Sequence, residues 1–514
     1  MDKPPNKYVL YHLLFIWFFM PSFHSFVALI SRKFHLWAGI VFAPLLIMLA
    51  ITGIGLNHPD WIRSLSFPVD VLPENYQYHN WNRGLVSAII SDEKGGYFAT
   101  GKEGVWHFID NEAKRLDNPY QDSAWKKMGY SLYLDSNTHH LLSGTREGIY
   151  SLNLVSNEWK TISGSPREQF VSIINGADGL LAISRKGLYH LKFHGQGYQL
   201  QPIPIKLADN GQSSPLYRLI FQLHSGELLG KVGIFIMDAA AGLLIFLSVS
   251  GLYMFVFPRL VKRKLLSREG RISGGRKFRW MLKHHNHWGL VIAIVLLISG
   301  ATGLLMRPPG LLLVSNVQSP IKIKDLHFSP LPHSIGKALW NPKQNALMLL
   351  TSGGLYREAP EMKNLFVPAD LPVPISGMGA NVFQHYKRSF IVGSFKGLFH
   401  WDPASERVSP VASETWPRRV MPTALLENEG DMALFDFSKG LRLSQNSQLS
   451  IPQMPDDINH QASISLWHLF FELHNLRFFR FILGPSYLLL LALTGLMLVL
   501  ISITGIYDYF KKRR

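Results

Sequence analysis

The chain of 514 residues contains no cysteine. This absence excludes disulfide bonds, thiolate metal sites, iron–sulfur clusters and a cysteine nucleophile. A flavin or nicotinamide fingerprint is also missing, because the stretch SREGRISGG at 267–275 lacks the strand–turn–helix context that such a fingerprint needs. Any metal or cofactor must therefore be held by histidine, carboxylate, tyrosine or methionine side chains.

Acidic residues are scarce relative to basic ones, and the formal net charge is +17. Most of this excess lies in three short segments at 1–33, 258–283 and 507–514, and the middle segment holds ten Lys or Arg residues and one Glu. Each segment borders a strongly apolar run. This distribution is typical of a membrane protein with its basic segments inside, and it argues against a nucleic-acid partner.

Four apolar runs are long enough to cross a bilayer, which takes about 20 residues, and they lie at 36–56, 232–257, 288–306 and 481–507. With the basic segments and both termini in the cytoplasm, the two long connections lie outside. We therefore expect a multi-pass protein of the bacterial inner (cytoplasmic) membrane, surrounded by the lipid bilayer, with a periplasmic β-domain. In the first half we expect an N-terminal apolar segment (1–33), a first span (34–58), half of the β-domain (59–213) and a lead-in helix with the second span (214–257). A basic cytoplasmic loop (258–283) follows. The second half then has a third span (284–307), the other half of the β-domain (308–463), a lead-in helix with the fourth span (464–507) and a basic cytoplasmic tail (508–514).

The N-terminal apolar segment at 8–30 has several interpretations that the sequence leaves open. It reads as a signal-like anchor, a fifth span or an interfacial helix, and Pro21 interrupts it. It lacks a clean small-residue cleavage site. Translation from Met20 is a further alternative.

Much of the sequence is a tandem repeat with an offset of 250 residues. The repeated segments are 34–56 with 285–305, LYRLIFQLHSGELLG at 216–230 with LWHLFFELHNLRFFR at 466–480, and, at an offset of 254, SVSGLY at 248–253 with SITGIY at 502–507. Each half crosses the membrane twice, so both halves insert with the same orientation. They should pack about a pseudo-two-fold axis along the membrane normal.

The two long connections contain a shorter repeat of 39 to 44 residues. Each unit has an apolar strand, a turn that ends in glycine, and an alternating apolar and aromatic strand; the glycines are Gly104, Gly148, Gly187, Gly354, Gly397 and Gly440. Such a period with short strands predicts propeller blades. Three blades from each half predict one six-bladed propeller, whereas two separate β-domains would leave exposed sheet edges.

Four histidines occupy matched positions in the two halves. His35 aligns with His285 at the inner ends of the first and third spans, and His224 aligns with His474 just before the second and fourth spans. Equivalent residues face each other across a two-fold axis if they point inward, and two facing imidazoles can be the axial ligands of a haem iron. The pattern predicts two haems, one near each membrane face. The alternative is that the histidines are ordinary interfacial residues.

Other residues compete for these roles or raise separate questions. The competing ligands are His287, His284, His58 and His468. Asp238 lies inside the second span, where a carboxylate needs a partner or a proton. Its candidate roles are to stabilise a haem environment, to relay a proton or to bond a neighbouring helix, and the last is the simplest. Thr-Gly and Ser-Gly pairs at 52–53, 302–303, 250–251 and 504–505 allow close helix packing, or leave room for a flat ring.

The motifs FHLWAG…LAITGIGLNH, FQLHSGELLG…SVSGLY, HNHWGL…SGATGLL and FELHN…LALTGLM resemble the PepSY-associated transmembrane helix family. The resemblance covers the spans and their lead-ins, about a third of the chain. It implies a four-helix bundle that binds b-type haem through His35, His285, His224 and His474, as in inner-membrane ferric-siderophore reductases. This chain departs from the family pattern in its second motif, where His287 follows His285, and in its propeller-like outer segments.

The sequence thus favours a haem-containing oxidoreductase that passes electrons across the membrane to a ferric-siderophore or other ferric complex. Its electron donor would be a cytoplasmic reductase that docks on 258–283, or quinol. The alternative is a propeller-bearing protein for binding, transport or sensing in iron uptake, without redox activity. The absorption of bound haem separates the two hypotheses.

Overall fold

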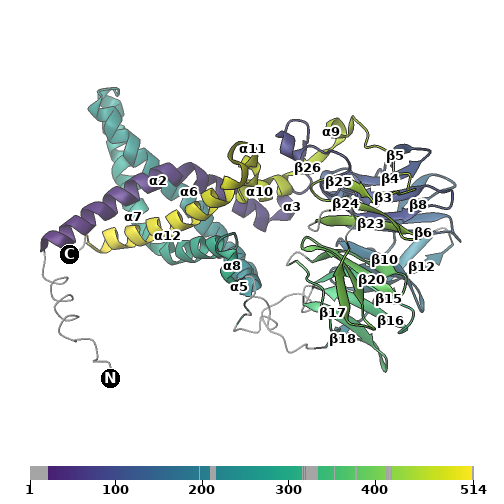
Figure 1. The fold of residues 1–514 in the computed structure, drawn as a ribbon. Coiled ribbons are helices and arrows are strands. Elements are labelled where there is room, and N and C mark those ends of the chain that lie inside the picture. Colours follow the sequence, from purple (N-terminus) through teal and green to yellow (C-terminus); the bar gives the residue numbers. More distant parts are fainter. Residues whose placement is uncertain are drawn as a thin grey trace, which may run out of the picture. The chain divides into compact units, whose positions relative to one another are not determined.

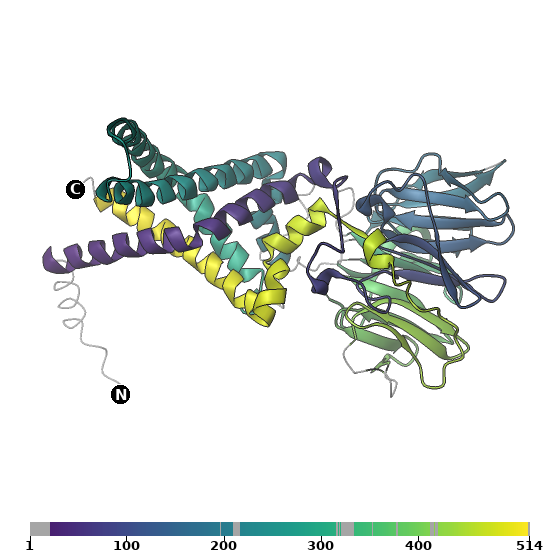
Figure 2. The same ribbon diagram turned by 90° about the horizontal axis from the view of Figure 1, so that it is seen from above.

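The structure is a computed structural model that describes residues 21–511, apart from 196, 209–215, 315–316, 318, 320–333, 352, 377–378, 412–415 and 417–419. It divides into two compact units, shown in Figure 1 and, from a second direction, in Figure 2. The helical unit comprises Met1–Pro59, Ser213–Leu326 and Leu469–Arg514. The β unit comprises Asp60–Gln212 and His327–His468.

Four long helices dominate the helical unit: α2 (Pro21–Asn57), α6 (Gly230–Lys262), α7 (Arg268–Leu305) and α12 (Tyr487–Lys511). Each contains or lies within a segment that is long and apolar enough to cross a membrane, so the chain is a multi-pass membrane protein. Shorter elements lead into the second and fourth of these helices or follow the third: α5 (Leu216–Ser225), η2 (Glu227–Leu229), α8 (Leu311–Val314), α10 (Leu466–His474), η4 (Arg477–Phe479), α11 (Arg480–Leu483) and η5 (Gly484–Ser486).

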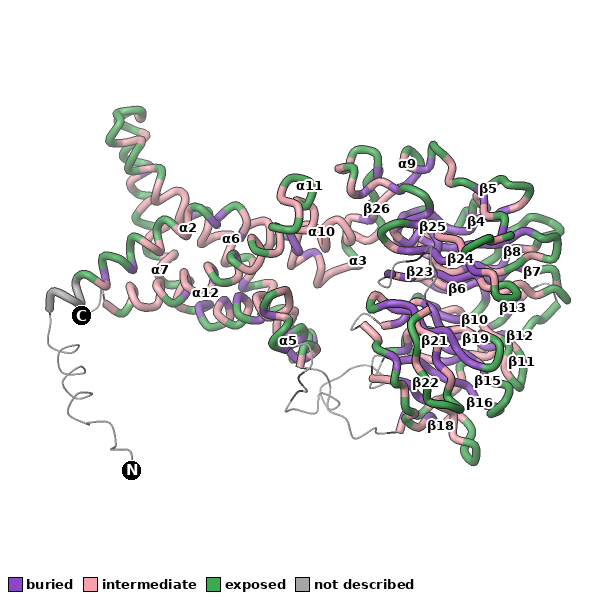
Figure 3. Tube along the Cα trace, in the orientation of Figure 1, coloured by how far each residue is buried: buried purple, intermediate pink, exposed green. Residues whose placement is uncertain are grey.

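The long helices form a closed bundle. Helix α2 contacts α6 and α12, and α7 contacts the same two helices, so α2 and α7 are diagonal to each other. A core of Phe42, Leu46, Ile292, Leu296 and Leu498 fills the centre. The outer surface is also apolar, with exposed side chains such as those of Val41, Phe235 and Ile294. Figure 3 shows how little of these helices is buried compared with the strands. Such an exterior suits lipid.

Two predicted segments differ from expectation in their local structure. The basic segment 258–283 is mostly helical rather than a loop, because α6 continues to Lys262 and α7 already begins at Arg268. Its Lys and Arg residues are good helix formers, and the Ser267 side chain caps α7 by accepting a hydrogen bond from the Gly270 backbone N–H. Residues 21–30 form the first turns of α2, while the rest of the N-terminal segment lies outside the described residues.

The described part of the β unit contains six larger sheets, antiparallel apart from one short added strand, and one two-stranded sheet. The first half provides β2 (Ala88–Ser91), β3 (Tyr97–Gly101), β4 (Gly104–Ile109) and β5 (Glu112–Leu116); β6 (Gly129–Asp135), β7 (His140–Thr145), β8 (Gly148–Asn153) and β9 (Glu158–Thr161); and β10 (Phe170–Gly176), β11 (Gly179–Ser184), β12 (Leu188–His194) and β13 (Gly197–Ile203). The second half provides β15 (Ile335–Asn341), β16 (Ala346–Thr351), β17 (Gly354–Ala359) and β18 (Met362–Ala369); β19 (Ala380–Tyr386), β20 (Ser389–Ser394), β21 (Gly397–Asp402) and β22 (Arg407–Pro410); and β23 (Pro422–Asn428), β24 (Asp431–Asp436) and β25 (Gly440–Leu443).

These sheets are the blades of one closed propeller, which confirms the predicted fold class. The innermost strands β2, β6, β10, β15, β19 and β23 each contact the next one, and β23 contacts β2. Short β14 (Lys206–Leu207) pairs in parallel with β18, which adds a strand from the first half to the fourth blade. The two halves contact each other at both seams, through β10 with β15 and β23 with β2, so the alternative of two separate β-domains is wrong.

The seam between the last and first blades is closed by buried packing and backbone hydrogen bonds. Trp81 is fully buried there with Phe435, and its indole N–H donates to the carbonyl of Pro452 at 2.8 Å. The Thr423 hydroxyl donates to the carbonyl of Val86 at 2.7 Å, across the same seam. A small sheet of β1 (Ser66–Pro68) and β26 (Ser463–Ser465) also joins the two ends of the unit.

Turns between the second and third strands carry the glycine repeat seen in the sequence. Gly104, Gly148 and Gly354 have φ values of +89°, +124° and +115°, which L side chains rarely adopt. The hydroxyls of Thr100, Thr145 and Thr351 donate to the carbonyls of these respective glycines at 2.9–3.1 Å. The repeat is therefore a turn that glycine and a preceding hydroxyl define together.

One of these turns predicts a pH dependence of stability. Burial raises the pKa of Glu103 to about 7, with Lys127 opposing the shift, and the Lys127 ammonium lies 3.8 Å from its carboxylate. The folded state therefore binds the proton more tightly than the unfolded state. The free energy of unfolding should fall by about 3 kcal/mol as the pH rises from about 4.5 through about 7.

Urea unfolding of the protein and of Glu103→Gln across this pH range would test the prediction. The variant should lose this part of the pH dependence, whereas Glu112→Gln, at an exposed position of β5, should keep it. An unchanged profile in Glu103→Gln would contradict the assignment.

Candidate functional site

The structure brings together the two histidine pairs that the repeat predicts. The ring centroids of His35 and His285 are 6.3 Å apart, and those of His224 and His474 are 6.1 Å apart. Two imidazoles that bind one metal ion from opposite sides, with metal–nitrogen bonds of about 2.0–2.1 Å, also place their centroids about 6 Å apart. Each pair therefore has the spacing of two axial ligands.

The members of each pair come from matched elements of the two halves. His35 lies on α2 and His285 on the diagonal helix α7, while His224 and His474 lie in the last turns of the lead-in helices α5 and α10. Thr52, which contacts His474, lies 17 residues after His35 on α2. At 1.5 Å per residue the two pairs are about 25 Å apart along this helix, so they occupy different depths of the bundle.

A hydroxyl group contacts Nδ1 of every one of the four histidines. The partners are Thr504 for His35 at 3.2 Å, Ser250 for His285 at 2.8 Å, Thr302 for His224 at 3.1 Å and Thr52 for His474 at 3.0 Å. In every case the hydroxyl belongs to the other half of the chain from the histidine. We call each such contact a hydroxyl bracket.

The brackets determine the tautomer of each imidazole. Each hydroxyl donates its single proton to a carbonyl three or four residues earlier in its own helix, so its oxygen is left to accept from Nδ1–H. Backbone carbonyls of Ile501 and Ser299 also lie near Nδ1 of His35 and His224, at 3.0 and 3.2 Å. With the proton on Nδ1, the lone pair that can bind a metal is on Nε2.

A glycine follows each bracketing hydroxyl and lets the imidazole approach the helix backbone. A Cβ atom on Gly53 would lie 3.3 Å from Cε1 of His474, and one on Gly303 would lie 3.3 Å from Cε1 of His224. For Gly505 and His35 the distance is 3.2 Å, whereas Gly251 leaves 3.8 Å to His285. The Thr-Gly and Ser-Gly pairs therefore seat the histidines, a role that the sequence interpretation missed.

Burial keeps the imidazoles of the lead-in helices neutral. It lowers the pKa of His224, and it lowers that of His474 to about 3, with further lowering by His224 and Arg307. Neutral imidazole is the form that binds metals. Among the described residues no group of three or more His and carboxylate side chains converges, so the described candidates for axial ligands are the paired histidines.

The competing histidines lie outside both pairs. His284 packs on the ring of Trp280, with centroids 4.4 Å apart, and His287 lies beside Trp288. His468 belongs to the β unit, where its Nδ1 lies 2.7 Å from the Ser465 hydroxyl and its ring lies 5.8 Å from Trp125. Each of these three, like His58 below, thus has a contact other than the paired rings.

Asp238 has partners at the end of α2. Its carboxylate lies 2.6 Å from Nε2 of His58 and accepts a hydrogen bond from the Asn57 amide at 3.0 Å. The same amide reaches the carbonyl of Ser225 at 3.4 Å, next to His224. Asp238 thus bonds a neighbouring helix, the simplest of the roles considered for it, and the contact occupies His58.

Arg307, which the sequence interpretation overlooked, lies near the His224–His474 pair. Its guanidinium donates to the side-chain oxygen of Asn475, the residue after His474, and burial lowers its pKa. A half-buried guanidinium at this position is suited to a carboxylate or another anionic group. Because Arg307 directly follows the third span, the sequence alone does not distinguish it from an ordinary basic residue at a membrane boundary.

A model of the PepSY-associated TM region matches residues 135–512, which include α6, α7 and α12 and most of the propeller. A search of curated proteins finds no match. Among solved structures, the chain is similar to the extracellular domain of a one-component system from B. thetaiotaomicron, at 11% identity and a TM-score of 0.37, over 74% of this chain and 40% of that one. It thus spans about two fifths of that protein's length.

Two further similar structures are propeller domains. The WD40 β-propeller domain of Doa1 is 8% identical with a TM-score of 0.31, over 76% of this chain and 98% of that one. The β-propeller domain of Cps50 (Swd1) from Myceliophteria thermophila is also 8% identical with a TM-score of 0.31, over 72% and 87% of the two chains.

Proposed function

Because the chain belongs to the PepSY-associated TM region family, we propose that it is a haem-containing oxidoreductase that passes electrons across the bacterial inner membrane to a periplasmic ferric complex. The observation that carries this proposal is the centroid spacing of the two histidine pairs, 6.3 and 6.1 Å. Haem b held between the rings of each pair would supply one-electron chemistry.

The residues of both sites fit such a group. Each imidazole is oriented by a hydroxyl that accepts from Nδ1–H, which is the outer-shell contact that metal-binding histidines usually make. The separation of about 25 Å along α2 is close to the thickness of a bilayer core. Two carriers at these depths support transfer from one face of the membrane to the other.

The charge distribution supports a cytoplasmic location for the inner ends of the helices. The segment 258–283 and the C-terminal tail are strongly basic, and such segments stay inside. The His35–His285 pair then lies at the cytoplasmic side and the His224–His474 pair at the periplasmic side, where the propeller would meet the substrate.

The electron balance requires a donor in or below the membrane. Reduction of one ferric complex to the ferrous state takes one electron, so a quinol that releases two electrons and two protons would reduce two complexes. An open hollow of about 530 Å³ on α2 and α12 is lined mostly by apolar side chains, including Phe34, Trp37 and Met497, together with Lys33. Such a surface on membrane-spanning helices is accessible from the bilayer, which supports a lipid-soluble quinol as donor over a cytoplasmic reductase.

The hydroxyl brackets predict a change in haem affinity. Thr302→Val removes one acceptor of the His224 Nδ1–H without changing the size of the side chain, and loss of such an outer-shell contact typically costs 10–100-fold in affinity. We expect haem at the His224–His474 pair to dissociate at least about 10-fold more readily, as measured by transfer to apomyoglobin. Thr494→Val is the matched control, because Thr494 bonds only the Leu490 carbonyl of its own helix among the described residues.

The experiment that tests the function is a reduced-minus-oxidised visible spectrum of the detergent-purified protein, with its haem-to-protein ratio. A ratio near two with b-type bands, followed by anaerobic reoxidation on addition of a ferric chelate, is the expected result. Absence of haem from protein made in haem-replete cells would overturn the proposal. The protein would then be a propeller-bearing binding, transport or sensor protein without redox activity.

A further inference from the structure

A cluster of three cations surrounds Tyr130 at one end of the propeller's innermost strands. The Lys337 ammonium donates to the carbonyls of Tyr130 and Val171 at 3.0 and 3.2 Å, and thus bridges β15 to β6 and β10. The Arg146 guanidinium donates to the Tyr130 hydroxyl at 3.1 Å. Arg185 completes the cluster, and its carbonyl accepts from the backbone N–H of Ile335 at 3.0 Å.

These residues belong to the same face of the propeller. Arg146 and Arg185 occupy the glycine turns β7–β8 and β11–β12, and each backbone N–H bonds the residue just before its blade's innermost strand. Lys337 lies at the register shift where β15 begins. The innermost strands line the central channel of a propeller, so the Lys337 ammonium, which bridges three of them, lies at one mouth of that channel, and the two arginines lie in turns of the same face.

Solvent reaches part of the cluster. Arg185 is exposed and Arg146 is half-buried, yet desolvation lowers the pKa of Arg185, and Arg146 nearby lowers it further. Burial also lowers the pKa of Lys337, to about 8. Like charges held together at the cost of desolvation are a common arrangement for binding an anion.

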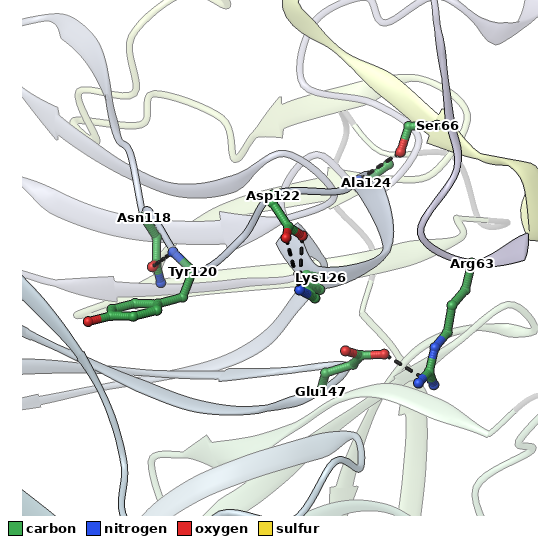
Figure 4. A network of polar contacts seen from close by, with 8 residues as sticks. All are labelled: Arg63, Ser66, Asn118, Tyr120, Asp122, Ala124, Lys126 and Glu147. Atoms are coloured by element: carbon green, nitrogen blue, oxygen red, sulfur yellow. Dashed lines mark hydrogen bonds and ion pairs between the residues drawn. The ribbon is translucent and has the colours of Figure 1, made fainter. Parts of the chain in front are cut away.

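Nearby carboxylates are already occupied. Glu147, adjacent to Arg146, forms an ion pair with Arg63 at 3.2 Å, as Figure 4 shows together with the surrounding polar contacts. Glu168 accepts a hydrogen bond from the Tyr189 hydroxyl. Among the described residues, no carboxylate lies within ion-pair distance of Arg146, Arg185 or Lys337.

An aromatic wall adjoins the cluster on one side. The guanidinium of Arg146 lies 3.7 Å from the ring centre of Trp125 and 5.6 Å from that of Trp467. Stacking holds the planar guanidinium in a fixed orientation. A preoriented guanidinium presents two parallel N–H donors, the geometry that suits carboxylate or catecholate oxygens.

We propose that this mouth of the propeller channel binds a negatively charged ferric chelate, through its carboxylate or other anionic oxygen donors. The iron part of this assignment rests on the proposed function, whereas the anion site itself does not. A cationic or neutral ferric chelate lacks the charge that three clustered cations would complement. The site therefore selects among ferric complexes by charge.

Calorimetric titration of the full-length protein in a neutral detergent tests this inference. The anionic probe is ferric citrate and the cationic probe is ferrioxamine. Ferric citrate should bind the unaltered protein and bind Arg185→Gln at least about 10-fold more weakly, since charge-assisted hydrogen bonds contribute on this scale. Lys160→Gln, with the same charge change on the outermost strand β9, should bind normally, and ferrioxamine should not bind at this site.

A second pair of variants separates charge from folding. Arg146→Gln should also weaken ferric citrate binding, and Arg146→Lys should restore part of the lost affinity. Both variants should unfold at the same temperature as the unaltered protein, which shows that they are folded. Unchanged affinity in both Arg185→Gln and Arg146→Gln would overturn the inference. So would equally tight binding of inorganic phosphate, which would assign the site to phosphate, free or in a lipid headgroup.

The result also separates this inference from the proposed function. Normal haem content and normal reoxidation by ferrioxamine, without any binding of ferric citrate, would remove only the anion site. Binding of ferric citrate that depends on Arg185, in protein that lacks haem, would remove only the redox function.

Discussion

Replacing His35 with alanine should lower the haem-to-protein ratio of the purified protein from about two to about one, because each histidine pair is expected to supply both axial ligands of one haem. His285→Ala should have the same effect, since its ring is the partner at 6.3 Å. Combining His35→Ala with His224→Ala should remove nearly all haem. Pyridine haemochrome assays with protein quantitation provide the measurement.

His287 and His284 supply matched controls for this experiment. Both lie on α7 within two residues of His285, but their rings pack on Trp288 and Trp280. Their alanine variants should keep two haems. Loss of a haem in His287→Ala but not in His285→Ala would show that the second motif uses the other histidine, and the pairing argued above would then be wrong.

Replacing Trp81 with alanine should destabilise the propeller by about 3–5 kcal/mol, the usual cost of deleting a large buried aromatic side chain. Trp81 has no exposed surface, and its ring centroid lies 5.4 Å from that of Trp106 and 4.8 Å from that of Phe108. The variant also leaves the Pro452 carbonyl without its indole donor. Pulse proteolysis across a urea series would measure the loss.

Two control variants accompany Trp81→Ala: one loses the indole hydrogen bond but keeps the packing, and the other changes an exposed apolar side chain. Trp81→Phe keeps most of the packing and should cost much less than Trp81→Ala. Met362→Ala, at a position that is 59% exposed, should change the free energy of unfolding by less than about 0.5 kcal/mol. If Trp81→Ala unfolds at the same urea concentration as Met362→Ala, the seam between the last and first blades does not hold the propeller closed.

The paired histidines could be predicted from the sequence because the two halves are related by a pseudo-two-fold axis. A residue close to such an axis contacts the equivalent residue of the other half, and the repeat alignment shows which residues are equivalent. It aligns His35 with His285 and His224 with His474. The blades were predictable for a related reason, since each one repeats a strand, a glycine turn and a strand.

The hydroxyl brackets were not predictable in this way. Alignment places Thr52 beside Thr302, but Thr52 contacts His474, which belongs to a different column. Such a contact depends on how helices of opposite halves pack, and a repeat offset carries no information about that. The cluster of three cations could not be predicted for the same reason. Arg146, Arg185 and Lys337 come from two turns and an inner strand, which approach one another only when the propeller closes.

The cross-half brackets make the two halves of the chain depend on each other. Each of the four paired histidines is bracketed by the opposite half, so a chain of half this length could form these sites only by pairing with a second copy. In one continuous chain, by contrast, matched positions of the repeat can carry different residues. Asn57 and Arg307 are such a pair in the repeat: Asn57 reaches the Ser225 carbonyl, whereas Arg307 donates to Asn475. The two matched contacts are thus neutral in one half and cationic in the other, so the surroundings of the His224–His474 pair are not two-fold symmetric.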